Sequence, residues 1–294
     1  MDKFFEQAEI IYDQFGVVIL GIDDLDAIKI SQHHVDNKNV CTKNCIRLKR
    51  EAMYQSLLDI EKVLPYYEDI QQNQVVKFST KKQQDKCQEI QGCFVIMERA
   101  STDLFKQIFS NYNQIKSFEI CKEIAIQVCE SVKEVHDKGL AHNDIKSDNF
   151  FYFNNGDIDI QVKIADFGYC CSNKMNKYDK FIEIFGSKNR RLLTQEVKKG
   201  LAQQNSLIQP EIDLDLQKSD IYNLGYLLFE LVYQISMKYL FEEENLEYFL
   251  QNEYGDFVTN LKEGHFFPII KGCLSEQPNE RFTIDEILQK LQCI

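Results

Sequence analysis

The sequence lacks any apolar run long enough to cross a membrane, and it lacks an excess of positive charge. Its longest uninterrupted apolar stretch, FGVVILGI, is far shorter than the roughly 20 residues that a membrane-spanning helix needs. The 294 residues include 34 Lys and Arg against 46 Asp and Glu, which gives a formal net charge of −12. This charge repels nucleic acid and anionic lipid and favours basic peptides. We therefore expect neither a membrane nor a nucleic-acid partner.

The N-terminus also lacks the apolar core of a secretory signal and carries acidic residues instead. We therefore expect an intracellular protein, in the cytoplasm or the nucleus. The ten cysteines lie at irregular spacings, which favours reduced, mostly buried thiols over a disulfide framework. The group His33, His34, Cys41 and Cys45 could bind zinc, but its spacing matches no familiar zinc module and coincidence is the simpler interpretation.

The front of the chain is rich in short-period apolar segments that are typical of strands. Residues 15–29 predict a hairpin followed by a third strand, and residues 41–64 have the spacing of a helix. Two further strands are expected at 74–80 and 93–98. The polar segment 81–91 between them has low complexity and predicts an exposed loop.

Helical spacing dominates the rest of the chain. It predicts helices at 104–109, 118–136, 220–235 and 284–291, and no internal repeat is visible. A small strand-rich front part and a larger helical back part indicate an α+β fold with two lobes.

Two polar segments, LAHNDIKSDNFF and VKIADFGYC, carry the most informative chemical pattern. Phosphoryl transfer needs a carboxylate at the attacking hydroxyl, a cation on the transferred phosphate and oxygen ligands for magnesium. These segments supply all three, and they resemble the catalytic loop His-Arg-Asp-x-Lys-x-x-Asn and the Asp-Phe-Gly motif of eukaryotic-type protein kinases. The resemblance covers almost the whole chain and implies a bilobal, protein-kinase-like fold.

The resemblance implies a role for each polar residue of the two motifs. Asp144 would accept the proton of the substrate hydroxyl, and Lys146 would contact the γ-phosphate of ATP. Asn149, the third catalytic residue, and Asp166 would bind Mg²⁺ through oxygen atoms. Alternatively, these residues only satisfy turns, but their order and fixed offsets make that the weaker interpretation.

The resemblance also implies an ATP site built around Lys29 in DAIKI, which would contact the α- and β-phosphates and pair with Glu51. A lysine inside an apolar strand is unusual for a simple surface charge. The adenine edge would meet the carbonyl of Glu98 and the N–H of Ala100. The full set of expected ATP-binding residues is Gly16, Val18, Ala27, Lys29, Glu51, Met97, Glu98, Ala100 and Phe151.

On this resemblance, residues 1–294 form a single protein kinase domain, with an N-lobe at 1–97, a C-lobe at 98–294 and a hinge at about 97–103. Three further residues would have structural roles. Asp220 would accept backbone N–H groups of the catalytic loop, and Arg281 would form a buried ion pair with Glu196, with Glu211 as the less favoured alternative.

Two departures from the kinase pattern affect the expected activity. Ile11 and Asp13 replace two of the three glycines of the phosphate-binding loop and leave only Gly16, which predicts weaker ATP binding rather than inactivity. Asn143 replaces the arginine that normally meets an activation-loop phosphate. We therefore expect activity that is constitutive or controlled by a regulatory partner, with little effect of Ser187 phosphorylation.

Lys146 lies two residues after the catalytic aspartate, as in serine/threonine kinases, and predicts phosphorylation of serine or threonine in a protein or peptide. Asp148 and Glu230 would suit a basic substrate, although both could equally be solvated carboxylates. The main alternative is a pseudokinase scaffold, which the altered glycine loop favours. A small-molecule phosphotransferase ranks last, since such enzymes generally lack the Asp-Phe-Gly and Glu196, Asp220 and Arg281 arrangement.

Overall fold

The computed structural model describes twelve parts of the chain: residues 3–14, 17–23, 25–32, 43–66, 71–80, 83–109, 115, 117–154, 160–173, 194–202, 214–234 and 261–294. The chain divides into two compact units. The first unit contains Met1–Ser101 and Ala165–Gly168, and the second contains Thr102–Ile164 and Tyr169–Ile294. No helix among the described residues is long and apolar enough to span a bilayer.

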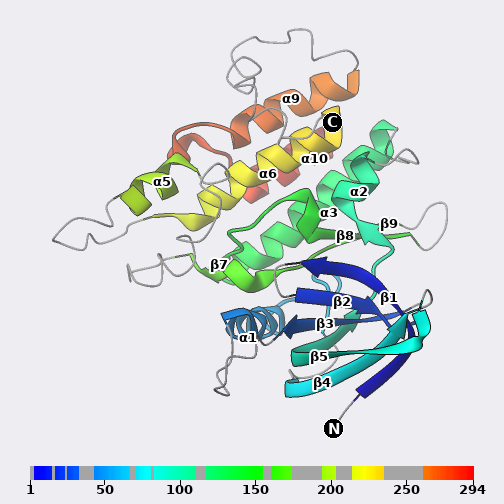
Figure 1. The fold of residues 1–294 in the computed structure, drawn as a ribbon. Coiled ribbons are helices and arrows are strands. Elements are labelled where there is room, and N and C mark those ends of the chain that lie inside the picture. Colours follow the sequence, from blue (N-terminus) through cyan, green and yellow to red (C-terminus); the bar gives the residue numbers. More distant parts are fainter. Residues whose placement is uncertain are drawn as a thin grey trace, which may run out of the picture. The chain divides into compact units, whose positions relative to one another are not determined.

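The first unit is a closed five-stranded barrel with the strand order β1-β2-β3-β5-β4 (Figure 1). Alternate strand residues point inward, so Leu20, Ile28 and Phe94 fill its interior with other apolar side chains. The strands are β1 (Lys3–Gln14), β2 (Val17–Gly21), β3 (Asp26–Gln32), β4 (Gln71–Thr80) and β5 (Gln83–Glu98).

Strand β1 pairs with two different neighbours along its length. Its first part, from Lys3 to Ala8, runs parallel to β4, and its second part, from Glu9 to Gln14, runs antiparallel to β2. A register shift between Ile10 and Tyr12 marks an irregularity of the kind that bends strands. The predicted hairpin therefore exists, but it begins well before residue 15.

The predicted loop at 81–91 is wrong for the residues that the structure describes there. Residues from Gln83 onward belong to β5 and pair antiparallel with β4. Exposed Cys87, Glu89 and Gln91 alternate with half-buried Gln88 and Ile90. Burial that alternates with a period of two residues is typical of a strand. The sequence did not reveal it, because the exposed and the half-buried residues are both mostly polar.

Helix α1 (Lys43–Gln55) packs against β3 and β5 of the first unit. Leu48 lies in a cluster with Cys93 and Val95, and Glu51 and Gln55 are also buried. The buried face of α1 therefore carries two polar side chains, which the site explains below.

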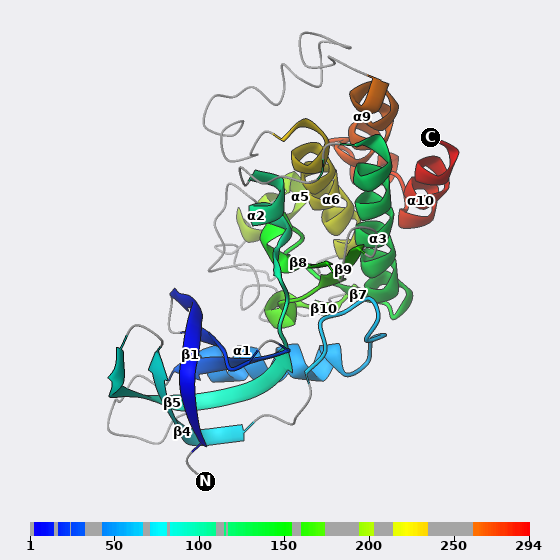
Figure 2. The same ribbon diagram turned by 90° about the vertical axis from the view of Figure 1, so that its right-hand side faces the viewer.

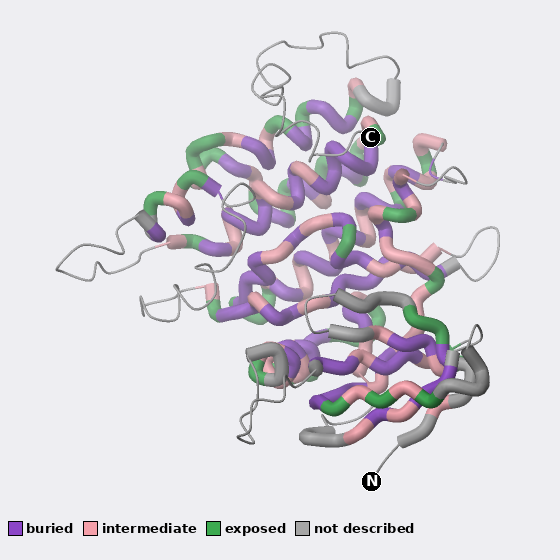
Figure 3. The backbone as a smooth tube through the Cα atoms, viewed as in Figure 1, coloured by how far each residue is buried: buried purple, intermediate pink, exposed green. Residues whose placement is uncertain are grey.

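Helices dominate the second unit, and α3, α6, α9 and α10 pack against one another (Figure 2). Buried residues follow the length of α3 and α6 (Figure 3). A Cβ on Gly225 of α6 would lie 2.8 Å from Cβ of Cys273 on α9, so this glycine permits the close approach of the two helices. The helices are α2 (Leu104–Phe109), α3 (Phe118–Asp137), α5 (Gln195–Ala202), α6 (Leu216–Tyr233), α9 (Leu261–Cys273) and α10 (Ile284–Cys293).

Short strands and 3-10 turns complete the described fold. The two small sheets have the orders β10-β7 and β6-β8-β9. The elements are β6 (Thr102–Asp103), β7 (Leu140–Ala141), β8 (Phe150–Asn154), β9 (Ile160–Ile164), β10 (Cys171–Ser172), η1 (Ser147–Asn149), η2 (Phe167–Tyr169) and η5 (Pro278–Glu280).

Five of the helices were predicted from spacing, although α1 ends at Gln55 and not near residue 64. The α+β fold with a strand-rich front and a helical back is confirmed. Helices α5 and α9 were missed. In α9, Pro268 lies inside the helix and Gly264 and Gly272 flank it, which are residues that normally argue against a helix interior.

Candidate active site

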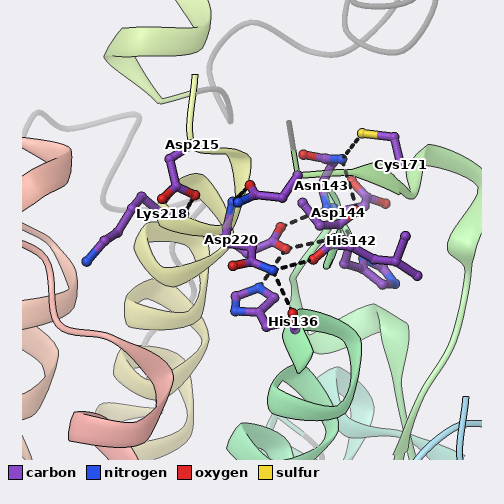
Figure 4. A network of polar contacts seen from close by, with 12 residues as sticks. His136, His142, Asn143, Asp144, Cys171, Asp215, Lys218 and Asp220 are labelled. Atoms are coloured by element: carbon purple, nitrogen blue, oxygen red, sulfur yellow. Dashed lines mark hydrogen bonds and ion pairs between the residues drawn. The ribbon is translucent and has the colours of Figure 1, made fainter. Parts of the chain in front are cut away.

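The catalytic loop of the second unit is fixed by one buried carboxylate (Figure 4). Asp220 of α6 is fully buried, and its two oxygens accept the backbone N–H groups of His142 and Asn143, each at 2.7 Å. His136 Nε2 lies 3.1 Å from the same carboxylate. The predicted structural role of Asp220 is confirmed, because two charge-assisted bonds from consecutive residues fix the path of the loop.

The three predicted catalytic side chains lie together on this loop. The amide nitrogen of Asn149 donates to the backbone oxygen of Asp144 at 2.8 Å and to its carboxylate at 2.9 Å. Lys146 Nζ lies 3.1 Å from the same carboxylate. The Asp144 side chain is only 14% exposed, so these two neighbours define its orientation.

Asn143 has a positive φ of 64°, a conformation that asparagine tolerates better than most residues. Its amide nitrogen lies 3.0 Å from the Tyr169 backbone oxygen and 3.2 Å from Cys171 Sγ. Both partners follow the Asp-Phe-Gly motif. Asn143 therefore links its loop directly to the residues that follow the Asp-Phe-Gly motif.

The predicted buried ion pair in the second unit is present. Arg281 Nη1 lies 2.6 Å from Glu196 Oε1, and the Arg281 side chain is 1% exposed. Burial alone would raise the pKa of Glu196, but the hydrogen bonds from Arg281 hold that pKa below its usual value. The competing candidate, Glu211, lies outside the described residues.

The first unit contains the predicted pair of Lys29 and Glu51. Lys29 Nζ lies 2.8 Å from each carboxylate oxygen of Glu51, and the Glu51 side chain is 2% exposed. Burial alone would lower the pKa of Lys29, but Glu51 and then Asp166 raise it above its ordinary value. The lysine is therefore held in its charged form.

Two residues beside this pair were not foreseen in their present roles. The Tyr66 hydroxyl donates to Glu51 Oε1, and the Gln55 amide nitrogen donates to the Leu64 carbonyl. Burial and the nearby carboxylate raise the pKa of Tyr66 well above its ordinary value, so its hydroxyl keeps the proton that it donates. Gln55 replaces an apolar residue of the family, and its bond ties the end of α1 to the segment that carries Tyr66.

Arg47 was also missed by the sequence. Its Nη2 lies 3.0 Å from both carboxylate oxygens of Asp166, which has a positive φ of 63°. The two residues are 119 positions apart, but both belong to the first unit. No local pattern in the sequence joins them.

The expected adenine-binding residues are described only in part. Ala27 on β3 pairs with Met97 on β5, and both are buried. Ala100 and, in the second unit, Phe151 are half-buried. Gly16 lies outside the described residues, as do the side chains of Ile11, Asp13 and Val18. The roles of all these residues toward ATP stay predictions.

Arg99, beside the expected hinge contacts, connects several parts of the first unit. Its guanidinium lies 2.6 Å from Glu9 Oε2 on β1 and 2.5 Å from the backbone oxygen of Asp23. It also crosses Gly21, where a Cβ would lie 2.8 Å from Arg99 Nη1. This side chain therefore joins the end of β5 to the β1–β2 hairpin.

No group of three or more metal-binding His, Cys, Asp or Glu side chains occurs in the described part of the chain. His33, His34 and Cys41 lie outside it, as does the Cys45 side chain. Cys170 and Cys171 are buried cysteines that are not part of a disulfide, as are several others among the described residues.

Several known proteins are similar to this chain in sequence. The protein kinase domain family matches residues 13–291. The chain is 24% identical over 281 residues to the interferon-induced, double-stranded RNA-activated protein kinase of Mus musculus. The aligned region covers 92% of this chain and 49% of that protein. It is 22% identical over 305 residues to serine/threonine-protein kinase Nek1 of Mus musculus, and this aligned region covers 99% of this chain and 21% of that protein.

A third relative, serine/threonine-protein kinase Nek5 of Homo sapiens, is 26% identical over 218 residues, or 69% of this chain and 26% of that protein. The chain thus spans half or less of the length of these relatives. The family match itself extends over nearly all 294 residues. The chain therefore belongs to the protein kinase domain family.

Proposed function

We propose that this protein kinase domain transfers the γ-phosphoryl group of ATP to serine or threonine residues of protein substrates. The observation that carries the proposal is that Lys146 and Asn149 both lie within hydrogen-bonding reach of the Asp144 carboxylate. A carboxylate oriented by an amide and accompanied by a cation suits a group that receives a hydroxyl proton next to a phosphate.

The described side chains support a distinct part of the reaction for each residue. Asp144 would orient the acceptor hydroxyl and take its proton, while Lys146 would stabilise the charge on the transferred phosphoryl group. Lys29 is kept charged by Glu51, so it could bind the remaining phosphates.

The family as a whole uses ATP and a divalent metal ion, and the donor atoms of this chain fit such an ion. Asn149 directs its amide nitrogen to Asp144, so its amide oxygen faces the other way. An amide oxygen and the Asp166 carboxylate are ligands that Mg²⁺ prefers. Mg²⁺ would supply charge neutralisation on the phosphates, and each of the two side chains offers it an oxygen ligand.

The substitution of Asn143 supports control that does not depend on activation-loop phosphorylation. Its amide already bonds to Tyr169 and Cys171 without any phosphate. A phosphate on Ser187 would meet no arginine at position 143 to order the segment. We therefore propose constitutive activity or control by a partner protein.

A preference for basic substrates would rest on Asp148 rather than on Glu230. Asp148 is exposed, whereas Glu230 is buried and accepts a hydrogen bond from Ser147 Oγ at 2.6 Å. A buried carboxylate that is already hydrogen-bonded is a poor contact for a substrate arginine.

The test is phosphate transfer from labelled ATP with Mg²⁺ to a basic Ser/Thr protein, to a tyrosine-containing polymer and to the chain itself. The Asp144→Asn variant should lose at least about 100-fold in rate, because it removes the proton acceptor. Asp137→Asn, an exposed carboxylate on α3, is the matched control and should change little.

Transfer to serine or threonine that disappears in Asp144→Asn supports the proposed function. Labelled phosphotyrosine in place of phosphoserine or phosphothreonine would correct the substrate class. Folded protein that transfers nothing at millimolar ATP would instead support the pseudokinase scaffold, which the altered glycine loop favours.

A further inference from the structure

Helix α1 presents two charged side chains, one turn apart, to two different functional residues of the first unit. Arg47 and Glu51 are four positions apart and therefore lie on the same face of the helix. Glu51 bonds to Lys29, whereas Arg47 bonds to Asp166. The helix thus contacts both the expected phosphate-binding cation and the expected metal-binding carboxylate.

The contact with Asp166 occupies both of its carboxylate oxygens. Arg47 Nη2 lies 3.0 Å from Oδ1 and 3.0 Å from Oδ2. These are the same two atoms through which Asp166 would ligate a divalent cation. A guanidinium and a metal ion cannot both approach these oxygens from the same side, since their positive charges repel each other.

A second observation shows that the Arg47 side chain lies close to the Asp-Phe-Gly segment along its length, and not only at the guanidinium group. A Cβ on Gly168 would lie 2.1 Å from Arg47 Nε, 2.7 Å from its Cγ and 2.9 Å from its Cδ. The arginine therefore runs along the backbone at Gly168 before it reaches Asp166. Any side chain at position 168 would have to displace it.

We propose that Arg47 is a positioning residue that holds the Asp166 carboxylate and competes with the divalent metal ion for it. The inference rests on the proposed function, because it assumes that Asp166 is a metal ligand. Arg47 keeps the carboxylate oriented and charge-balanced, and metal binding requires the guanidinium to withdraw. The chain therefore binds its metal more weakly than it would with a neutral residue at position 47.

The test measures metal binding directly, with Mn²⁺ as the probe metal in the presence of ADP. The concentration of free Mn²⁺ is followed by electron paramagnetic resonance. Arg47→Gln should lower the apparent Kd for Mn²⁺ by roughly fivefold, the scale of a partly exposed ion pair. Arg47→Lys, which keeps the charge but loses the planar fork, should fall between that variant and the wild type.

Lys49→Gln is the matched control, because two helical positions turn the side chain by about 200° and point it away from the Arg47 face. Thermal melts of all four proteins establish that each is folded. Equal Mn²⁺ affinity in Arg47→Gln and the wild type would overturn the inference and leave the proposed function standing. An equal gain in Lys49→Gln would also overturn it, since the effect would then come from net charge alone.

Failure of every protein to bind Mn²⁺ with ADP would overturn the inference together with the metal-dependent part of the proposed function. The expected order of affinity, Arg47→Gln above Arg47→Lys above wild type and Lys49→Gln, is specific to direct competition at Asp166.

Discussion

The two units hold their functional residues in different ways. In the second unit, Asp220 and Arg281 are almost completely buried, and each bonds to several groups that shape the catalytic loop or its supports. In the first unit, the contact of Arg47 with Asp166 is partly exposed, since Arg47 is 37% and Asp166 28% exposed, whereas Glu51 beside it is buried. The departures from the kinase pattern at Ile11, Asp13 and Gln55 also fall in the first unit.

On the proposed function, this difference would leave proton acceptance fixed by the fold and the handling of nucleotide and metal more open to change. Exposed ion pairs contribute little to stability and exchange partners readily. Buried ones tolerate no loss of a partner. Substitutions of these residues in the second unit should therefore lower its stability before they affect ligand binding. In the first unit they should affect ligand binding before they lower stability.

The largest effect is expected from Arg281→Gln in the second unit. It leaves the Glu196 carboxylate without its cation, and the free energy of unfolding should fall by about 3–5 kcal/mol. Urea unfolding followed by circular dichroism measures this loss. Lys199→Gln, an exposed lysine on α5, should change the value by less than about 0.5 kcal/mol.

The same pair gives the second unit a pH dependence with a definite sign. The folded pKa of Glu196 lies below its ordinary value of 4.5, so its contribution is complete above that pH and is lost as the pH falls below it. Arg281→Gln should remove this acid-side loss. A variant that keeps the full wild-type slope would show that Arg281 does not control this carboxylate.

A smaller effect, on binding rather than on folding, is expected from Tyr66→Phe in the first unit. It removes the hydroxyl that donates to Glu51, a charge-assisted bond of about 1.5–3 kcal/mol, and it frees the carboxylate to move away from Lys29. The KM for ATP should rise severalfold, as measured by steady-state kinetics.

Tyr226→Phe is the control for this prediction, because it removes a hydroxyl that donates to Tyr222 at 2.9 Å within the second unit. It should lower stability without a change in the KM for ATP. If the two tyrosine variants raised the KM for ATP equally, the expectation that only the first-unit variant affects ATP binding would be wrong.

The smallest effect is expected from restoring glycine at two positions with Ile11→Gly and Asp13→Gly together. Closer backbone approach and the loss of one negative charge should lower the KM for ATP by only a few fold, because on the proposed function the metal and Lys29 would carry most of the charge neutralisation. Glu89→Gln, an exposed carboxylate on β5, controls for the change in net charge. A KM that stays unchanged would mean that the loop contributes little to ATP binding in this protein.

The sequence predicts best those features that depend on short, fixed spacing. The cluster of Asp144, Lys146 and Asn149 was anticipated from the resemblance of this segment to the kinase catalytic loop, and Asp144 and Asn149 are only five positions apart. The pairs of Asp220 with the loop and of Arg281 with Glu196 were anticipated by resemblance to the family.

The features that were missed depend on contacts between distant segments or on weak composition. Arg47 and Tyr66 reach their partners only after α1 has packed on the barrel, and nothing near them in the sequence specifies that register. The predicted strand began later than β5 does, because the alternating residues at the start of β5 are mostly glutamine and glutamate and not apolar residues. Tertiary pairing with β4 decided the structure there.

The two-sided pairing of β1 also bears on how this protein behaves in concentrated solution. Sheets with an unpaired outer strand offer backbone groups to other chains and promote aggregation. Here Lys3 to Ala8 pair with β4 and Glu9 to Gln14 pair with β2, so the barrel closes on itself. Removal of the residues before Glu9 would open β4 as an edge, and the shortened protein should associate through that strand.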